Sequence, residues 1–220
     1  NYFVIEFEKP FTYQATVADS IVKENGTEQQ ADHAGAIIGF ATKKGETVHA
    51  RVASSFISPE QALLNLKELG NDDFNTLVEK GKAAWNDVLS KIEVEGGNLD
   101  QYRTFYSCLY RSLLFPRKFY EVDAQGQIVH YSPYNGEVVP GYMYTDTGFW
   151  DTFRCLFPLL NLIYPSVNKE IQEGLINTYK ESGFFPEWAS PGHRGCMIGN
   201  NSASILVDCL LYTSDAADEE

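Results

Sequence analysis

Apolar and polar residues alternate with a period of two in three stretches of the first 58 residues. In "NYFVIEFEKPF", Phe3, Ile5 and Phe7 fall on one face of a predicted strand, and Pro10 ends it. The stretches "AGAIIGFAT" and "ETVHARVASSFIS" predict two more strands separated by the turn "KKGE", and "KENGTEQQ" is typical of a loop. Residues 1–58 therefore indicate an antiparallel β region. Because three strands alone would expose an apolar face, we expect further strands upstream.

The spacing of apolar residues changes to three or four after Ser58, which indicates helices. "SPEQALLNLKELG" places Ser58 at a helix N-cap, Pro59 at the first helical position and Gly70 after the last turn. "DDFNTLVEKGKAAWNDVLSKIEV" predicts a second helix, in which Gly81 is a weak point. We expect these two helices to connect two layers of the protein.

Helices predominate in the rest of the chain. "NLDQYRTFYSCLYRSLLFP" is typical of a helix that Pro116 stops, and "KFYEVDAQGQIVHY" of a hairpin around residues 124–126. Three more helices are predicted for "FWDTFRCLFPLLNLIY", "SVNKEIQEGLINTYKESG" and "NNSASILVD". Strands followed by helices predict an α+β fold, with the helices packed as hairpins in one layer.

Composition narrows the possible partners. With 220 residues, 44% of them hydrophobic, the chain is long enough for one or two domains with a core. Its 30 acidic and 17 basic residues give a net charge of −13, which argues against a nucleic-acid partner. No apolar run approaches the ~18 residues that span a bilayer, so no transmembrane segment is expected, and no signal peptide is visible. The four widely spaced cysteines favour free thiols over a zinc site.

The first candidate site is the polar and aromatic stretch "YMYTDTGFWDTFRCLFPLL". It places Asp146, Trp150, Asp151 and Arg154 within nine residues, where a loop enters a predicted helix. Carboxylates accept hydrogen bonds from sugar hydroxyls, and a Trp ring packs against the C–H face of a sugar. In the alternative interpretation, Asp151 only stabilises the helix N-terminus and pairs with Arg154.

The second candidate site is the Gly- and Pro-rich loop in "SGFFPEWASPGHRGCMIGNNSASILVD". It holds Glu187, Trp188, His193 and Arg194 between two apolar helices. A loop that is rich in aromatic and titratable residues is more often functional than a plain connection. His193 could equally be an ordinary exposed residue beside Arg194. Spacing and composition alone therefore predict a helical domain with two candidate sugar-binding segments.

A family resemblance extends this interpretation. "GFWDTFR" followed by "PLL", and then "GFFPEWASPGHRGCMIGNNSASILVD", resemble the calcium-dependent exo-α-mannosidases of glycoside hydrolase family 92. "FYSCLYRSLLFPRKFYEVD" and "FISPEQALLNL" resemble other parts of the same family, so the likeness covers residues 1–208. The resemblance implies that residues 1–58 end an N-terminal antiparallel β-sandwich, that residues 59–97 are linker helices, and that residues 98–208 begin an (α/α)₆ barrel.

The resemblance also implies a reaction. Family members remove terminal mannose from α-mannosides, such as those of N-glycans and mannans, with inversion of configuration. They use a Ca²⁺ cofactor, and they act outside the cytoplasm, in the periplasm, at the cell surface or in secreted form. Inversion requires one general acid and one general base on opposite sides of the scissile bond.

The motif matches assign a role in the family's site to only a few residues of this chain. The match places Asp151 against sugar hydroxyls, with Trp150 and Arg154 supporting it, and Glu187, Trp188 and His193 near the site. The catalytic acid, the base and most calcium ligands are expected downstream of this chain, so no catalytic or metal-binding residue is assigned. We therefore expect the 220-residue chain to be an inactive internal fragment.

Two other functions stay open at this point. The chain could belong to another glycosidase or a phosphorylase with the same sandwich and barrel, acting on a glucan. It could also be a non-catalytic carbohydrate-binding protein that keeps only the sugar-contacting loops.

The last residues, 209–220, differ in character from what precedes them. "CLLYTSDAADE", from Cys209 to Glu219, resembles a translated transposase sequencing adapter. We therefore interpret this stretch as an artefactual tail and expect Asp208 to be the last residue of biological origin.

Overall fold

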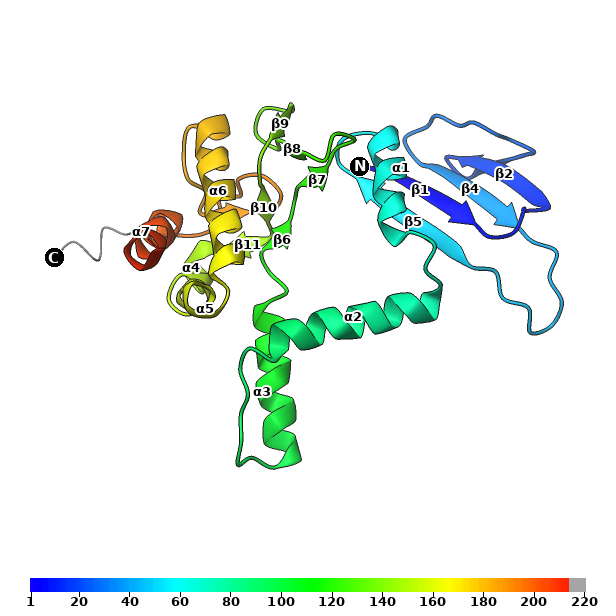
Figure 1. The fold of residues 1–220 in the computed structure, drawn as a ribbon. Helices are drawn as coiled ribbons and strands as arrows, with labels where there is room; N and C mark the ends of the chain where they lie inside the picture. The colour runs from blue at the N-terminus through cyan, green and yellow to red at the C-terminus, as the bar shows by residue number, and fades with distance from the viewer. Residues whose placement is uncertain (214–220) are drawn as a thin grey trace.

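The structure is a computed structural model that describes the backbone of residues 1–213 and the side chains of residues 1–209. The predicted tail lies partly outside this range, because residues 214–220 are not described. The N-terminal part consists of short strands and one helix, and the C-terminal part consists mainly of helices, with α2 running between them (Figure 1). The α+β prediction, with antiparallel sheets, is confirmed.

Five strands form two antiparallel sheets near the N-terminus. One sheet pairs β1 (Tyr2–Phe7) with β5 (Ala50–Ser55), and the other has the order β3 (Ile21–Glu24), β2 (Tyr13–Ala18), β4 (Ala34–Gly39). Both β4 and β5 were predicted, and the turn between them is present, since the Glu46 N–H donates to the Lys43 carbonyl oxygen over 3.0 Å. The two strands nevertheless belong to different sheets, because alternation identifies a strand but not its partner.

The strands β2 and β3 were missed by the sequence pattern, and Lys23 and Glu24 of the predicted loop belong to β3. Asp19 and Ser20 join them in a two-residue turn with positive φ angles of 46° and 73°. Such turns usually contain Gly or Asn, so "DS" is a weak signal. The first 58 residues thus contain five strands where three were expected.

The two helices predicted after Ser58 are confirmed, the first with its predicted cap, and their role as linkers stays a prediction. Ser58 accepts a hydrogen bond from the Gln61 N–H at the start of α1 (Pro59–Leu66), which continues into a short 3₁₀ turn, η1 (Lys67–Leu69). Asp73 caps α2 (Phe74–Leu89) by accepting from the Thr76 N–H over 2.7 Å. Gly81 does not interrupt α2, since an isolated Gly costs a helix only about 1 kcal/mol.

Short strands connect these helices to the C-terminal part. After α3 (Leu99–Ser112), the predicted hairpin forms from β7 (Glu121–Val122) and β8 (Ile128–Tyr131), and β9 (Val138–Pro140) adds a third strand. Two further ribbons pair β6 (Arg117–Lys118) with β10 (Tyr144–Thr145), and β11 (Thr147–Gly148) with β12 (Trp188–Ala189). The second ribbon joins the two candidate segments.

The helix predicted from Phe149 is two helices. The short α4 (Phe149–Thr152) and α5 (Leu156–Ile163) are separated at Cys155, whose φ and ψ of −131° and −50° leave the helical region. The α6 (Pro165–Ser182) and α7 (Asn201–Thr213) helices follow, so α7 continues past residue 208. The helices of residues 1–213 do not close into a barrel, and the domain boundaries at residues 58, 97 and 208 stay predictions.

One hydrophobic core holds the C-terminal part together. It combines side chains from β10, α4, α5, α6 and α7: Tyr144, Phe149, Phe157, Leu160, Tyr164, Ile171, Leu175 and Ile205. Because Phe149 is only 2% exposed, the start of α4 is fixed in this core. The residues that follow Phe149, including Asp151, therefore project from a firmly packed base.

Candidate functional site

The β11–β12 ribbon brings together two segments that are about forty residues apart in the sequence. Thr147 lies opposite Ala189, and Gly148 lies opposite Trp188. Backbone hydrogen bonds continue beyond the ribbon, from the Asp146 N–H to the Ala189 carbonyl oxygen over 2.9 Å and from the Phe149 N–H to the Glu187 carbonyl oxygen over 3.2 Å. The two segments selected from the sequence therefore form one site.

Gly148 lets the indole of Trp188 approach Asp151. A Cβ atom on Gly148 would lie 2.1 Å from Trp188 Nε1 and 2.9 Å from Asp151 Oδ2. The indole N–H donor and the carboxylate acceptor thus both lie next to the buried Gly148, around the position that a side chain would occupy. Such a pairing of a donor, an acceptor and an aromatic ring suits a polyol ligand.

Arg154 stacks on aromatic rings and is not paired with Asp151 among the described ion pairs. Its guanidinium carbon lies 4.5 Å from the ring centroids of both Trp150 and Phe153, and Nη1 donates to the Trp150 carbonyl oxygen over 3.0 Å. Trp150 is 41% exposed. The Arg154 guanidinium therefore packs against the Trp150 ring and holds it in place. The structure does not support the predicted alternative of an Asp151–Arg154 pair.

Residues 187–194, called here the 187–194 segment, fold back on themselves. The Arg194 N–H donates to the Trp188 carbonyl oxygen, and the Ser190 N–H donates to the Gly192 carbonyl oxygen, each over 2.8 Å. His193 Nε2 lies 4.0 Å from Glu187 Oε2, and both side chains are about one-third exposed. One compact turn thus contains three residues that were predicted to belong to the site: Glu187, Trp188 and His193.

Asp146 is a further site residue whose partner the sequence did not reveal. Its carboxylate accepts hydrogen bonds from Nε, over 2.6 Å, and Nη2 of Arg117, and Ser190 Oγ donates to its other oxygen over 3.4 Å. Its φ of 60° is unusual for a residue other than Gly but tolerated by Asp. Asp146 separates two strands with different partners: β10, before it, pairs with β6, and β11, after it, pairs with β12.

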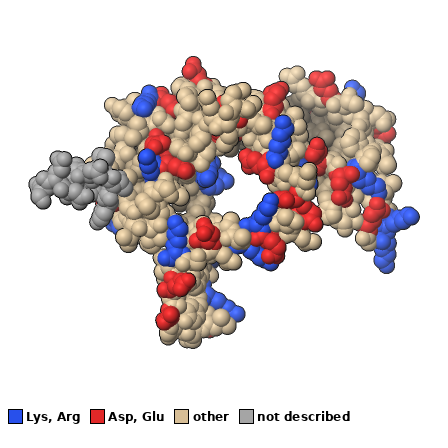
Figure 2. Space-filling model, viewed as in Figure 1, with Lys and Arg blue, Asp and Glu red and all other residues tan. Residues whose placement is uncertain are grey.

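A cleft of about 540 Å³ lies beside Asp146. Residues near the end of β5 line one side of it, and residues of β6 and β10 line the other, including Phe56, Arg117 and Asp146. Figure 2 shows the molecule open between its strand-rich and helical parts, with acidic and basic side chains interspersed around the opening. Of the two candidate segments, Asp146 and Pro191 line this cleft, whereas Asp151 and Trp188 do not.

No metal ligand is assigned among the described residues. They contain no group of three or more His, Cys, Asp or Glu side chains placed to hold a metal ion. Ca²⁺ takes six to eight oxygen ligands, whereas Asp151 and Glu187 supply only two carboxylates here. The described helices also contain none that is long and apolar enough to cross a membrane.

Comparison with known proteins places this chain among the glycoside hydrolases. Residues 61–219 match the family model described as the glycosyl hydrolase family 92 catalytic domain. The chain therefore belongs to glycosyl hydrolase family 92, and the resemblance drawn from its motifs is confirmed. The matched range includes residues 209–219, so the interpretation of these residues as an adapter stays a prediction.

Solved structures agree with this assignment. The chain superposes on a family GH92 inverting mannosidase from Bacteroides thetaiotaomicron with a TM-score of 0.92 and 52% identity, covering 95% of this chain and 28% of that one. A GH92 α-mannosidase from the same organism, solved in complex with mannoimidazole, gives a TM-score of 0.82 and 28% identity, covering 96% and 29%.

A curated relative is more distant. An uncharacterized secreted glycosidase from Arthroderma benhamiae is 26% identical over 181 residues, which are 79% of this chain and 19% of the relative. The chain thus spans less than a third of each of these three proteins.

Proposed function

We propose that the complete protein containing this chain is an inverting exo-α-mannosidase. Its substrates are the terminal α-mannosides of N-glycans or mannans. The observation that carries this proposal is the 52% identity, over 95% of this chain, with a GH92 inverting mannosidase. The proposal concerns the complete protein, because the chain spans only 28% of that enzyme.

The chain contributes substrate-binding residues to this activity. Asp151 accepts hydrogen bonds from mannose hydroxyls, and the Trp188 indole N–H beside it donates one. Trp150, held by Arg154, offers an apolar face to the sugar ring. Glu187 and His193, which belong to the 187–194 segment, lie near the bound sugar. The close approach of Trp188 and Asp151 over Gly148 supports these roles.

Inversion requires a carboxylic acid that protonates the leaving oxygen and a carboxylate that activates water, roughly 6.5–9.5 Å apart. We assign neither role within the chain, and both belong to other parts of the complete enzyme. A Ca²⁺ ion, held by ligands that we also place outside the described residues, would polarise mannose hydroxyls. We place the enzyme in the periplasm, at the cell surface or outside the cell, which the secreted curated relative supports.

The test follows hydrolysis of α-linked mannobiose by the complete protein with NMR. We expect β-mannose as the first product, which reports inversion. Asp151→Asn should lower kcat/KM by about 10²-fold, since a hydrogen bond to a reacting sugar contributes about 2–3 kcal/mol. Asp100→Asn is the matched control, because the Asp100 side chain is 90% exposed on α3. Release of α-mannose, or an unchanged Asp151→Asn variant, would contradict the proposal.

A second measurement separates this proposal from its alternatives. Chelation should abolish activity, and added Ca²⁺, but not Mg²⁺, should restore it, because the two ions differ in size and ligand number. A complete protein that is active on glucans and indifferent to chelation would be a different glycosidase or a phosphorylase. Mannoside binding without any turnover would indicate a carbohydrate-binding protein.

A further inference from the structure

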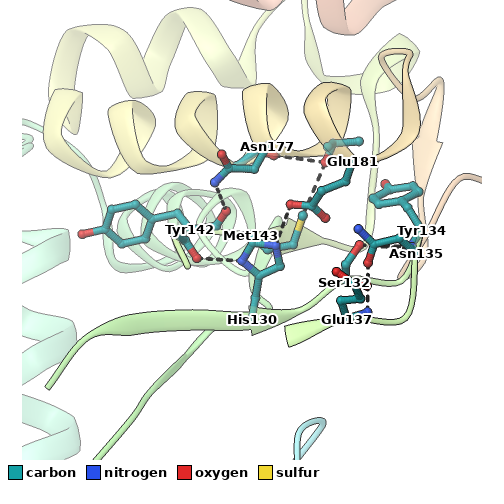
Figure 3. A network of polar contacts seen from close by, with 12 residues as sticks. His130, Ser132, Tyr134, Asn135, Glu137, Tyr142, Met143, Asn177 and Glu181 are labelled. Atoms are coloured by element: carbon teal, nitrogen blue, oxygen red, sulfur yellow. Dashed lines mark hydrogen bonds and ion pairs between the residues drawn. The ribbon is translucent and has the colours of Figure 1, made fainter. Parts of the chain in front are cut away.

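His130 and Glu181 form a buried pair behind the 187–194 segment. His130, on β8, has no exposed surface; its Nδ1 lies 2.7 Å from the Gly141 carbonyl oxygen and its Nε2 lies 2.9 Å from Glu181 Oε1 on α6 (Figure 3). A carbonyl oxygen only accepts hydrogen bonds, so Nδ1 carries a hydrogen. The 2.9 Å separation of Nε2 and Glu181 Oε1 is that of a hydrogen bond. The pair therefore ties β8 to α6.

The strand β8 leads directly into a well-ordered loop between β8 and β9. Ser132, which is fully buried, accepts hydrogen bonds from the N–H groups of Tyr134 and Asn135, each over 3.3 Å. Asn135 Oδ1 in turn accepts from the Glu137 N–H over 2.9 Å. These bonds fix the loop relative to His130, two residues before Ser132.

This loop contacts the 187–194 segment at Gly192. A Cβ atom on Gly192 would lie 3.3 Å from the Pro133 carbonyl oxygen and 3.8 Å from Tyr134 Cε1. The neighbouring Pro191 carbonyl oxygen accepts a hydrogen bond from Thr145 Oγ1 over 3.2 Å. The turn of the segment is thus held by the β8–β9 loop and by β10.

We propose that His130 and Glu181 are positioning residues for the 187–194 segment. By fixing β8 to α6, they hold the β8–β9 loop where it supports Gly192, and with it Trp188 and His193. The proposal rests on the proposed function, because the purpose of the segment is taken to be sugar binding. Neither residue of the pair touches the sugar.

The experiment compares Glu181→Ala with Glu181→Gln in the complete protein. Glu181→Ala should raise KM for an α-mannoside at least about threefold, with a smaller change in kcat, as expected for a residue that acts through others. Glu181→Gln should restore KM, because an amide can donate to neutral Nε2 in the same position. Asn168→Ala is the control: Asn168 is also on α6 and is fully buried, but it hydrogen-bonds Asn161 and Gln172. It should lower the unfolding temperature and leave KM unchanged.

A second variant and a second measurement keep the proposal testable if Glu181→Ala does not fold. Ser132→Ala removes one oxygen atom from the β8–β9 loop and should raise KM in the same direction. Amide hydrogen exchange of Ser190 and Arg194 should accelerate in Glu181→Ala and in Ser132→Ala, and not in Asn168→Ala. This measurement needs no activity, so it distinguishes failure of the positioning role from failure of the mannosidase proposal. Unchanged exchange in Glu181→Ala and Ser132→Ala would overturn the positioning role.

Discussion

Gly148 and Trp188 face each other across the β11–β12 ribbon so closely that no side chain fits at position 148. A Cβ atom there would lie 2.1 Å from Trp188 Nε1 and 2.6 Å from Trp188 Cδ1, well inside contact distance. The two residues belong to the two separate segments that the sequence selected. Their contact therefore determines the position of the Trp188 indole relative to the Asp151 carboxylate.

Replacing Gly148 by Ala should displace the Trp188 ring. We expect a loss of about 1–3 kcal/mol in the free energy of unfolding of the complete protein, as for other overpacked sites, together with a higher KM. Chemical denaturation and steady-state kinetics measure the two effects. Gly81→Ala is the control, since a Cβ there meets no atom within 4 Å and should stabilise α2 by about 0.5–1 kcal/mol. Equal stability of Gly148→Ala and wild type would contradict the close contact.

Asp146 combines a left-handed backbone with an ion pair, and two variants separate these features. Asp146→Gly keeps the backbone conformation but loses the carboxylate, whereas Asp146→Ala loses both. We expect Asp146→Ala to be less stable than Asp146→Gly by about 1 kcal/mol. Arg117→Gln should cost less than about 1 kcal/mol, because the Arg117 side chain is 65% exposed. If Asp146→Gly and Asp146→Ala unfold at the same denaturant concentration, the backbone conformation contributes nothing.

Stability should fall at alkaline pH because of Tyr144. Burial first, and then its hydrogen bond to Glu170, raise the pKa of the Tyr144 phenol above its ordinary value. Since the folded state favours the neutral phenol, this contribution is complete below about pH 10 and is lost as the pH rises further. Unfolding curves between neutral pH and pH 11, with tyrosinate absorbance, should show this loss. Tyr144→Phe should weaken the dependence, and replacing the half-exposed Tyr13 by Phe should not.

The isolated 220-residue chain should aggregate and should not hydrolyse mannosides. Large apolar side chains lie open on its helical part, with Leu162 and Ile198 each 81% exposed, and such surfaces are normally covered. No catalytic acid or base is assigned within it. Light scattering and a mannosidase assay, run beside the complete protein, test both statements. A monomeric chain that unfolds in one cooperative transition, or that is active, would contradict them.

Local patterns predicted the helices well. The cap at Ser58 and the period-two strands β1, β4 and β5 depend on residues close in sequence, and all are present. Partners depend on distant residues, so the placement of β4 and β5 in separate sheets could not be predicted. The break at Cys155 was also missed, because the apolar spacing continues across it.

The residues of the candidate site were predicted, but the contacts that bring them together were not. Motifs selected Asp151 and Trp188, while the ribbon that joins them consists of only two residues on each side, too short for a periodic signal. The bond between Arg117 and Asp146 links residues 29 positions apart. His130 and Glu181 gave no signal, since a buried His on a strand resembles any other core residue in one sequence.

The pairing of β1 with β5 determines the order in which the N-terminal part can be completed during synthesis. Tyr2 lies opposite Ser55, whereas β2, β3 and β4 lie between them in the chain and form their own sheet. As the ribosome releases the chain, that inner sheet can form before β5 is available to pair with β1. In a nascent chain halted before β5, the edge of β1 that pairs with β5 should therefore exchange its amide hydrogens freely, and in one halted after α1 it should be protected.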